Sequence, residues 1–139
     1  MKKSIIKDKS YSFALRIIIL ARCLRNQKDY DLASQVLRAG TSIGANVEEA
    51  LAAISRAEFV AKMAIASKEA RETHYWLRLL RDSRVVPAAR ITSLLDEGLE
   101  LIRILTAIVK TGQGTKDLDV RAPNSCATNR RASLPSTKN

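Results

Sequence analysis

A regular seam of small and apolar residues constrains the fold more than any other feature of the chain. Its members recur at alternating steps of four and three residues: Phe59, Met63, Ala66, Ala70, Thr73, Leu77 and Leu80. This a/d-type spacing places all of them on one face of a helix that packs nearly antiparallel to its neighbours in a bundle. Ser55 and Glu58 have capping-box spacing directly before the seam, so the helix is predicted to begin there.

Three other segments repeat the helical spacing. One runs from about residue 10 to 26, one follows Asp29 as an N-cap, and one begins at Pro87, a residue suited to the first helical turn. Their apolar stripes are, in order, Phe13, Ile17, Leu20 and Leu24; Leu32, Val36, Ile43, Val47, Ala50 and Ile54; and Ile91, Leu94, Leu95, Leu101, Ile102, Leu105, Ile108 and Val109. No segment alternates at the period of a strand. The sequence therefore predicts an all-α fold, an up-down-up-down antiparallel four-helix bundle.

The composition of the chain changes near residue 110. The last part holds Pro123 and Pro135 and almost no large apolar side chains, so it cannot bury enough surface to offset the entropy of ordering it. We predict a four-helix bundle over residues 1–111 and a disordered basic tail over residues 112–139. The tail carries five basic residues against two acids, so +7 of the net charge of +10 lies on the bundle.

The stretch Gly40-Thr-Ser-Ile-Gly44 matches the pattern of a nucleophilic serine, but that pattern needs a preceding strand and a later acid and histidine. The only histidine is His74, inside the helix that carries the seam. The stretch also lacks the lysine of a phosphate loop. Because the apolar rhythm continues through it, we predict that it lies within the second helix. The two glycines and Ala45 would form a low ridge that another helix approaches, with Ser42 and Asn46 hydrogen-bonding across it.

No arrangement of residues typical of catalysis or metal binding is present. Metal sites in bundles use Glu-x-x-His pairs, and His74 would need a glutamate at position 71, which is arginine. Cys23 and Cys126 form no metal or redox motif and fit a reducing cytosol. The apolar run over residues 17–21 is far too short to span a bilayer. We expect a non-enzymatic cytoplasmic protein with no catalytic residue, no metal, no cofactor and no membrane partner.

The basic charge of the bundle predicts a polyanionic partner. Lysine and arginine neutralise phosphates, and tyrosine stacks on bases, so the expected partner is RNA or DNA. The candidate nucleic-acid-binding residues are one stripe of the third helix opposite its seam, and two cations of the first helix: Lys68, Arg71, Tyr75 and Arg78, with Arg22 and Arg25. The alternative is a protein-interaction scaffold or adaptor with no direct nucleic-acid role. In that case the charge serves solubility, and Lys68 and Arg71 pair with local acids.

Three motifs together resemble a known family: residues 35–50 (QVLRAGTSIGANVEEA), 55–59 (SRAEF) and 68–77 (KEARETHYWL). They are similar to the four-helix-bundle family named after a supposed ribosomal protein. Its members are encoded within intervening sequences of bacterial large-subunit ribosomal RNA genes and elsewhere in bacterial genomes. The resemblance covers about residues 8–110. Where many members have Ser-Ile-Pro-Ala-Asn, this chain has Gly44 in place of the proline.

The resemblance implies a homopentamer. It also implies a fold similar to the accessory variability protein of diversity-generating retroelements, a basic, pentameric, nucleic-acid-binding partner of a reverse transcriptase. A reverse transcriptase is therefore an expected partner if the gene is linked to a retroelement. The family has no established catalytic residues. The positions expected to serve helix packing or an interface are Arg38, Gly40, Ser42, Gly44, Asn46, Glu49, Glu69, Glu72 and Trp76.

Overall fold

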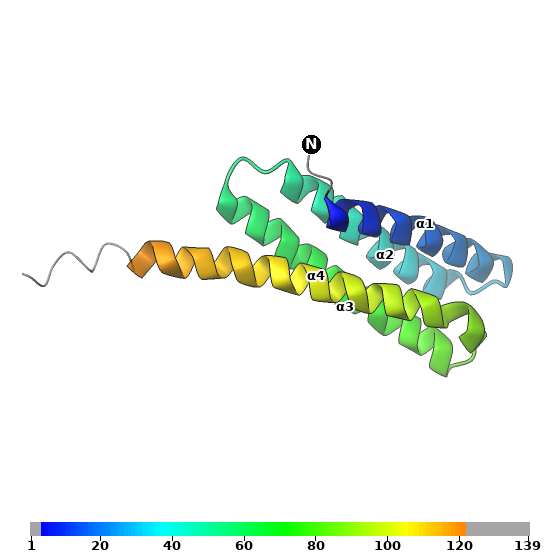
Figure 1. The fold of residues 1–139 in the computed structure, drawn as a ribbon. Helices are drawn as coiled ribbons and strands as arrows, with labels where there is room; N and C mark the ends of the chain where they lie inside the picture. The colour runs from blue at the N-terminus through cyan, green and yellow to red at the C-terminus, as the bar shows by residue number, and fades with distance from the viewer. Residues whose placement is uncertain (1–3, 122–139) are drawn as a thin grey trace, which may run out of the picture.

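The computed structural model describes residues 4–121, with side chains through residue 114. Four helices make up this part of the chain: α1 (Ile5–Asn26), α2 (Tyr30–Leu51), α3 (Arg56–Asp82) and α4 (Ala88–Arg121). The connections are short, so consecutive helices run antiparallel (Figure 1). No strand occurs between residues 4 and 121. The predicted all-α four-helix bundle is confirmed.

The core is built from the predicted stripes. α2 packs against both α1 and α3, and α3 packs against α4, whereas α1 and α4 touch least. The buried apolar side chains include Phe13, Ile17, Leu20 and Leu24; Val36, Ile43, Val47 and Ala50; Met63, Ala66, Ala70, Leu77 and Leu80; and Ile91, Leu94, Leu95, Leu101 and Leu105. Thr73 is the polar member of the seam, and its hydroxyl donates to the Glu69 carbonyl at 2.7 Å. The seam is therefore buried without leaving a hydroxyl unsatisfied.

Two helix ends differ from the prediction. α1 begins at Ile5, earlier than residue 10, because the Ser4 side chain caps it by accepting from the Lys7 amide at 3.3 Å. α2 ends at Leu51, so the prediction that Ile54 continues its buried stripe is wrong; this side chain is 98% exposed. The predicted capping box explains the break, since the Glu58 amide donates to the Ser55 hydroxyl at 3.1 Å and starts a new helix.

The end of α4 also differs from the prediction. The helix continues to Arg121, past the boundary predicted at residue 111. Gly112 is buried, and a Cβ atom at this position would overlap Val60 of α3. The missing side chain lets the last part of α4 stay in contact with the start of α3. The rest of the predicted tail, residues 122–139, lies outside the described residues.

Candidate nucleic-acid interface

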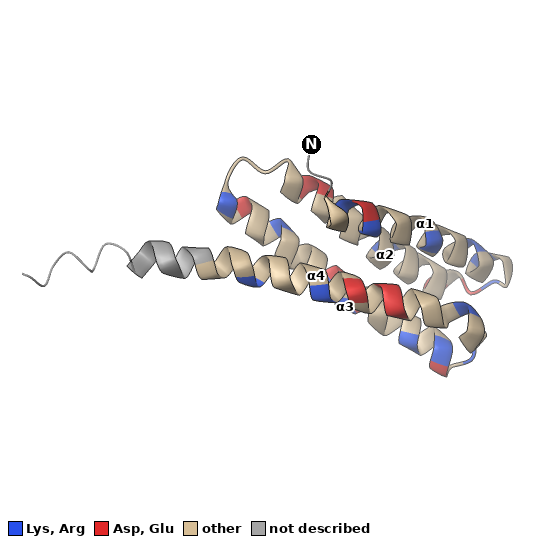
Figure 2. Cartoon of the chain, in the orientation of Figure 1, with Lys and Arg blue, Asp and Glu red and all other residues tan. Residues whose placement is uncertain are grey.

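The predicted stripe on α3 lies on the surface of the bundle. Lys68, Arg71, Tyr75 and Arg78 are all exposed, and basic residues mark this helix in Figure 2. Arg71 donates to the Thr106 hydroxyl of α4 at 3.2 Å. Among the side chains of residues 4–114, no carboxylate lies within ion-pair distance of the three cations. The expectation that Lys68 and Arg71 pair with local acids is therefore wrong, and their charges remain available to an external anion.

Tyr75 is held by contacts within the stripe. The Arg78 guanidinium carbon lies 5.8 Å from the centre of the Tyr75 ring, a cation–π contact. Tyr75 also meets the Trp76 ring edge to face, with ring centres 5.5 Å apart. Its side chain is 47% exposed. A base that stacks on the open part of this ring would do so beside the Arg78 charge.

Glu69 and Glu72 of α3 face α2 and leave the stripe unpaired. Arg38 of α2 reaches both of them, with its Nη1 atom 3.6 Å from Glu69 Oε2 and its Nη2 atom bonded to Glu72. Lys62 of α3 likewise lies 2.7 Å from Glu49 of α2, and this hydrogen bond raises the pKa of the lysine. These predicted packing positions thus join α2 to α3. Exposed pairs of this kind add little to stability, because solvent screens them.

The two glycines of α2 face α1, but not equally closely. A Cβ at Gly40 would lie 2.6 Å from Ile17 Cγ2, whereas one at Gly44 would lie 3.5 Å from Ser10 Oγ. Real Cβ atoms essentially never approach to the first distance, and the second is ordinary contact. Within the predicted ridge, α1 and α2 therefore approach each other most closely at Gly40. Ala45 is exposed and does not belong to it.

The polar residues beside the glycines do not bridge helices. The Ser42 hydroxyl donates to the Ala39 carbonyl at 2.9 Å, and the Asn46 amide donates to the Ser42 carbonyl at 2.8 Å. The predicted hydrogen bonds across the ridge are wrong, because these short side chains reach carbonyls one turn back in their own helix. Trp76 packs against the core, and its indole nitrogen is buried without an acceptor in the described structure.

Arg22 and Arg25 lie away from the α3 stripe. Both are exposed near the end of α1, which lies diagonally across the bundle from α3. The end of α1 nevertheless meets the end of α3 through the two connections that follow them. The Gln27 side chain donates to the Val85 carbonyl at 3.1 Å. The structure thus brings Arg22 and Arg25 to the same end of the bundle as Arg78, whereas Lys68 and Arg71 lie further along α3, a placement that helix spacing alone does not reveal.

His74 is half-buried on α3, beside Gly98 of α4. Burial lowers the pKa of its imidazole, and the charges of Arg78 and Arg81 lower it further. The neutral ring is thus favoured near pH 7. Within residues 4–114, where the side chains are described, no group of three or more His, Cys, Asp or Glu side chains is placed to hold a metal ion.

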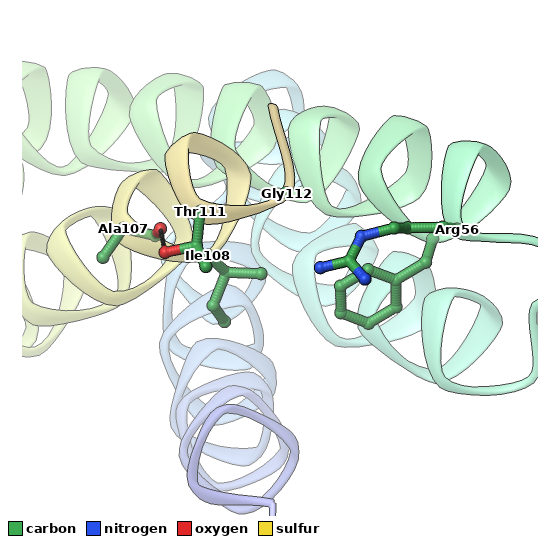
Figure 3. Close-up of a pocket in the computed structure, with 6 residues that line it drawn as sticks. Arg56, Ala107, Ile108, Thr111 and Gly112 are labelled. Carbon is green, nitrogen blue, oxygen red and sulfur yellow. Dashed lines mark hydrogen bonds between the residues drawn. The ribbon is translucent and has the colours of Figure 1, made fainter. Parts of the chain in front are cut away.

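Three surface pockets lie between helices in the described part of the chain, and two of them have no acidic residue in their lining. One, of about 500 Å³, lies between the start of α3 and the second half of α4 and is lined by Arg56, Phe59, Ala107, Ile108, Thr111 and Gly112 (Figure 3). The Thr111 hydroxyl is turned back to the Ala107 carbonyl at 2.9 Å. The other, of about 600 Å³, lies between α1 and the start of α4, with Arg16, Cys23 and Arg90 among its lining residues. Neither lining includes a carboxylate or a histidine that could act as a general acid or base. The third pocket, of about 400 Å³ between α1 and α4, is lined by Asp8, Glu97 and Glu100 among others. Its two α4 carboxylates pair with Arg16 and Lys9 of α1.

The fold and its outer charges define a small all-α bundle with an arginine-rich surface. The chain belongs to the family described as 23S rRNA-intervening sequence protein, which matches residues 2–107; the predicted family is confirmed. The fold is similar to a crystal structure of a protein with unknown function from the S23 ribosomal protein family of Bacteroides thetaiotaomicron. The two share 45% identity with a TM-score of 0.75, over 76% of this chain and 99% of that one.

Comparison with proteins of curated function gave no match. As for membranes, none of the helices between residues 4 and 121 combines the length and the apolar character that crossing a bilayer requires.

Proposed function

We propose that this protein is a non-enzymatic, cytoplasmic, homo-oligomeric four-helix bundle that binds RNA or DNA through its basic surface. The observation that carries the proposal is the α3 stripe, where Lys68, Arg71 and Arg78 are exposed and have no carboxylate partner within the described residues. Uncompensated cations on one face attract a phosphate backbone, and binding releases the counterions condensed on it.

A gel-shift titration with single-stranded and duplex probes over a range of salt concentrations tests nucleic-acid binding. For a single strand, the logarithm of the affinity falls with the logarithm of salt concentration by about 0.7 for each phosphate contact. Lys68→Gln/Arg71→Gln is expected to weaken binding and to reduce this slope by about 1.4. Arg103→Gln/Lys110→Gln removes the same charge from exposed positions of α4 and serves as the matched control. The absence of any shift at low salt, with every probe, would refute nucleic-acid binding.

The homo-oligomer in this proposal is supported by an apolar stripe on the outside of α1. Tyr11, Leu15, Ile18 and Ile19 are exposed and lie on one face of the helix. A solvent-exposed stripe of large apolar residues is typical of a surface that contacts another chain. A pentamer, and a reverse transcriptase as a further partner, follow from the family resemblance. Light scattering that gives a monomer mass at micromolar concentration would remove the oligomer from the proposal.

The second candidate is a protein-interaction scaffold, and the same α1 stripe favours it. In that case Leu15 and Ile19 contact a different protein, and the charge on α3 only keeps the bundle soluble. The two candidates separate in one pull-down experiment with Arg71→Gln/Arg78→Gln. A stable protein partner that is captured without nucleic acid, and at unchanged affinity by this variant, favours the scaffold. Loss of nucleic acid from the captured material favours the leading proposal.

A further inference from the structure

The connections that follow α1 and α3 share an unusual backbone feature. Lys28 has a φ of 69° and Arg84 a φ of 61°, and they are the only residues other than glycine with positive φ in the described chain. This left-handed conformation at the end of a helix is usually taken by glycine, because a Cβ atom disfavours it. In this protein a basic residue takes it in both places.

The hydrogen bonds around these residues identify the position as the one that usually holds glycine. The Lys28 amide donates to the Arg25 carbonyl at 3.0 Å, and the next amide, of Asp29, donates to the Leu24 carbonyl at 2.9 Å. These two bonds make a Schellman motif at the end of α1. At the end of α3, the Arg84 amide donates in the same way to the Arg81 carbonyl at 3.1 Å. The Leu80 carbonyl, however, accepts from the Val86 amide at 3.3 Å and not from the residue directly after Arg84. The two helix ends therefore share the first bond and a left-handed cation, but only α1 has the complete motif.

The two connections also lie together. Gln27 donates to the Val85 carbonyl at 3.1 Å and to the Asp29 carboxylate at 2.6 Å. Gln27 directly precedes Lys28, and Val85 directly follows Arg84. The two left-handed cations thus belong to one small surface, which we name the connection end and define as residues 22–31 together with 78–90.

The connection end carries a strong excess of positive charge. Its basic residues are Arg22, Arg25, Lys28, Arg78, Arg81, Arg84 and Arg90, and its acids are Asp29, Asp31 and Asp82. Figure 2 shows basic residues gathered where α3 turns into α4. Arg81 pairs with Asp82 at 2.8 Å, whereas Lys28, Arg84 and Arg90 have no carboxylate within ion-pair distance among the side chains described, those of residues 4–114. Most of this charge is therefore not neutralised by the protein itself.

Helix electrostatics explains only part of this charge. A cation in the last turn of a helix is favoured by the helix dipole, which accounts for Arg25 and Arg81. It does not account for cations at the two left-handed positions, where glycine would be the more stable choice. In addition, α2 and α4 begin at this end, and their first turns add positive potential. Lys28 and Arg84 thus occupy backbone positions where their side chains cost conformational free energy, and helix electrostatics does not explain why cations are found there.

We propose that the connection end is a contact surface for the phosphodiester backbone of nucleic acid, with Lys28 and Arg84 each contacting a phosphate. This inference rests on the proposed function and extends it. Arg78 belongs both to the α3 stripe and to the connection end, so a bound strand passes from the stripe across Arg78 onto the two connections. The two left-handed positions hold the cations on short, mutually bonded turns, which limits the entropy lost when a phosphate binds.

The test is the variant Lys28→Asn/Arg84→Asn, measured with labelled 20-nucleotide oligo(U) RNA and oligo(dT) across salt concentrations. Asparagine tolerates the left-handed conformation, so the backbone is kept while both charges are lost. The melting temperature, followed by circular dichroism, should stay at or above that of the original protein. The affinity should fall, and the salt slope should decrease by about 1.4, the value for two phosphates of a single strand.

The matched control is Arg103→Gln/Lys110→Gln, which removes two cations of α4 outside the connection end. It should leave the slope unchanged.

If oligo(U) and oligo(dT) bind the asparagine variant with the original affinity and slope, the inference is wrong although the proposed function stands. It is equally wrong if the control loses as much slope as the asparagine variant, since charge alone would then explain the loss. If the original protein binds neither probe at low salt, the proposed function itself fails. Should the asparagine variant melt early, Lys28→Gly/Arg84→Gly provides the same charge change at positions that favour glycine.

Discussion

The close approach of α1 to α2 predicts that one substitution has opposite effects at two neighbouring glycines. Replacing glycine by alanine inside a helix stabilises it by about 1 kcal/mol. At Gly44 the new methyl group would sit 3.5 Å from Ser10 Oγ, in ordinary contact, so Gly44→Ala should keep this gain. At Gly40 the methyl group would lie 2.6 Å from Ile17 Cγ2 and 2.8 Å from Cγ1.

Ile17 has little freedom to move away. It is fully buried, and both close carbon atoms are attached to its branched Cβ, whose χ1 angle is stiff. Overpacking of a core costs about 1–3 kcal/mol. After the helix-propensity gain of about 1 kcal/mol is subtracted, Gly40→Ala should range from neutral to about 2 kcal/mol less stable than the original protein.

Urea unfolding followed by circular dichroism measures both variants. Gly44→Ala should be the more stable of the two by about 1–3 kcal/mol, at each of several protein concentrations, since oligomer formation would make stability depend on concentration. The reasoning would be refuted if Gly40→Ala were as stable as Gly44→Ala. A double-mutant cycle with Ile17→Ala adds a second check, because removing the close carbons should abolish most of the penalty at Gly40.

Three further predictions concern the connection end, pH and the contact between α1 and α4. Lys28→Gly should raise the free energy of unfolding in urea by about 1 kcal/mol, because it removes the left-handed strain; an unchanged value would mean that no strain is relieved. His74 has a lowered pKa in the folded state, so its contribution to stability is present above its ordinary pKa of about 6.5 and is lost as pH falls through the lower folded value. His74→Gln should therefore flatten the fall of the melting temperature below pH 7, and parallel curves for the two proteins would contradict this. Arg16 bonds Glu97 and Ser93 of α4, so Arg16→Ala should speed amide hydrogen exchange in α1 more than in α2, whereas a uniform change would argue against a local role.

The helices could be predicted because their signals are local. In α3, the capping box of Ser55 and Glu58 and the apolar seam agree on where the helix begins, and the structure has the same start. The spacing of apolar residues gives a wrong prediction at the end of α2, where no capping residue marks the end of the helix. Ile54 fits the spacing of α2, yet spacing alone does not tell whether the backbone stays helical between two residues in phase.

The end of α4 could not be predicted for the opposite reason. The tail is predicted from its prolines and its lack of large apolar side chains, which say nothing about a single close contact at Gly112. In the structure Gly112 is needed where Val60 of α3 approaches, and a contact between residues so distant in the chain is not visible in local composition. The wrong hydrogen bonds predicted for Ser42 and Asn46 have a similar origin, since the sequence does not show whether a polar side chain turns outward or back to its own helix.

The α3 stripe could be predicted from angular spacing alone, because Lys68, Arg71 and Arg78 belong to one helix. The connection end could not. Lys28 and Arg84 come together because the connections after α1 and α3 lie at the same end of the bundle, and their positive φ angles follow from the turns that they complete. The only hint in the sequence is that a basic residue, Lys28 or Arg84, stands just after a helix, where glycine is the usual choice.

The missing side chain at Gly40 leaves a small space in the surface of α2, which has a consequence for the axial register of α1 against α2. Ile17 fills this space, and sliding α1 by one turn along α2 would bring Phe13 or Ala21 to it instead. Phenylalanine is too large for the space, and alanine would leave part of it empty. A single missing side chain in the middle of α2 thereby sets the level at which α1 ends, and with it the level at which Gln27 meets Val85. Gly40 thus fixes the register of α1 against α2. It thereby helps to place Lys28 beside the connection that holds Arg84, although Gly40 contacts neither residue.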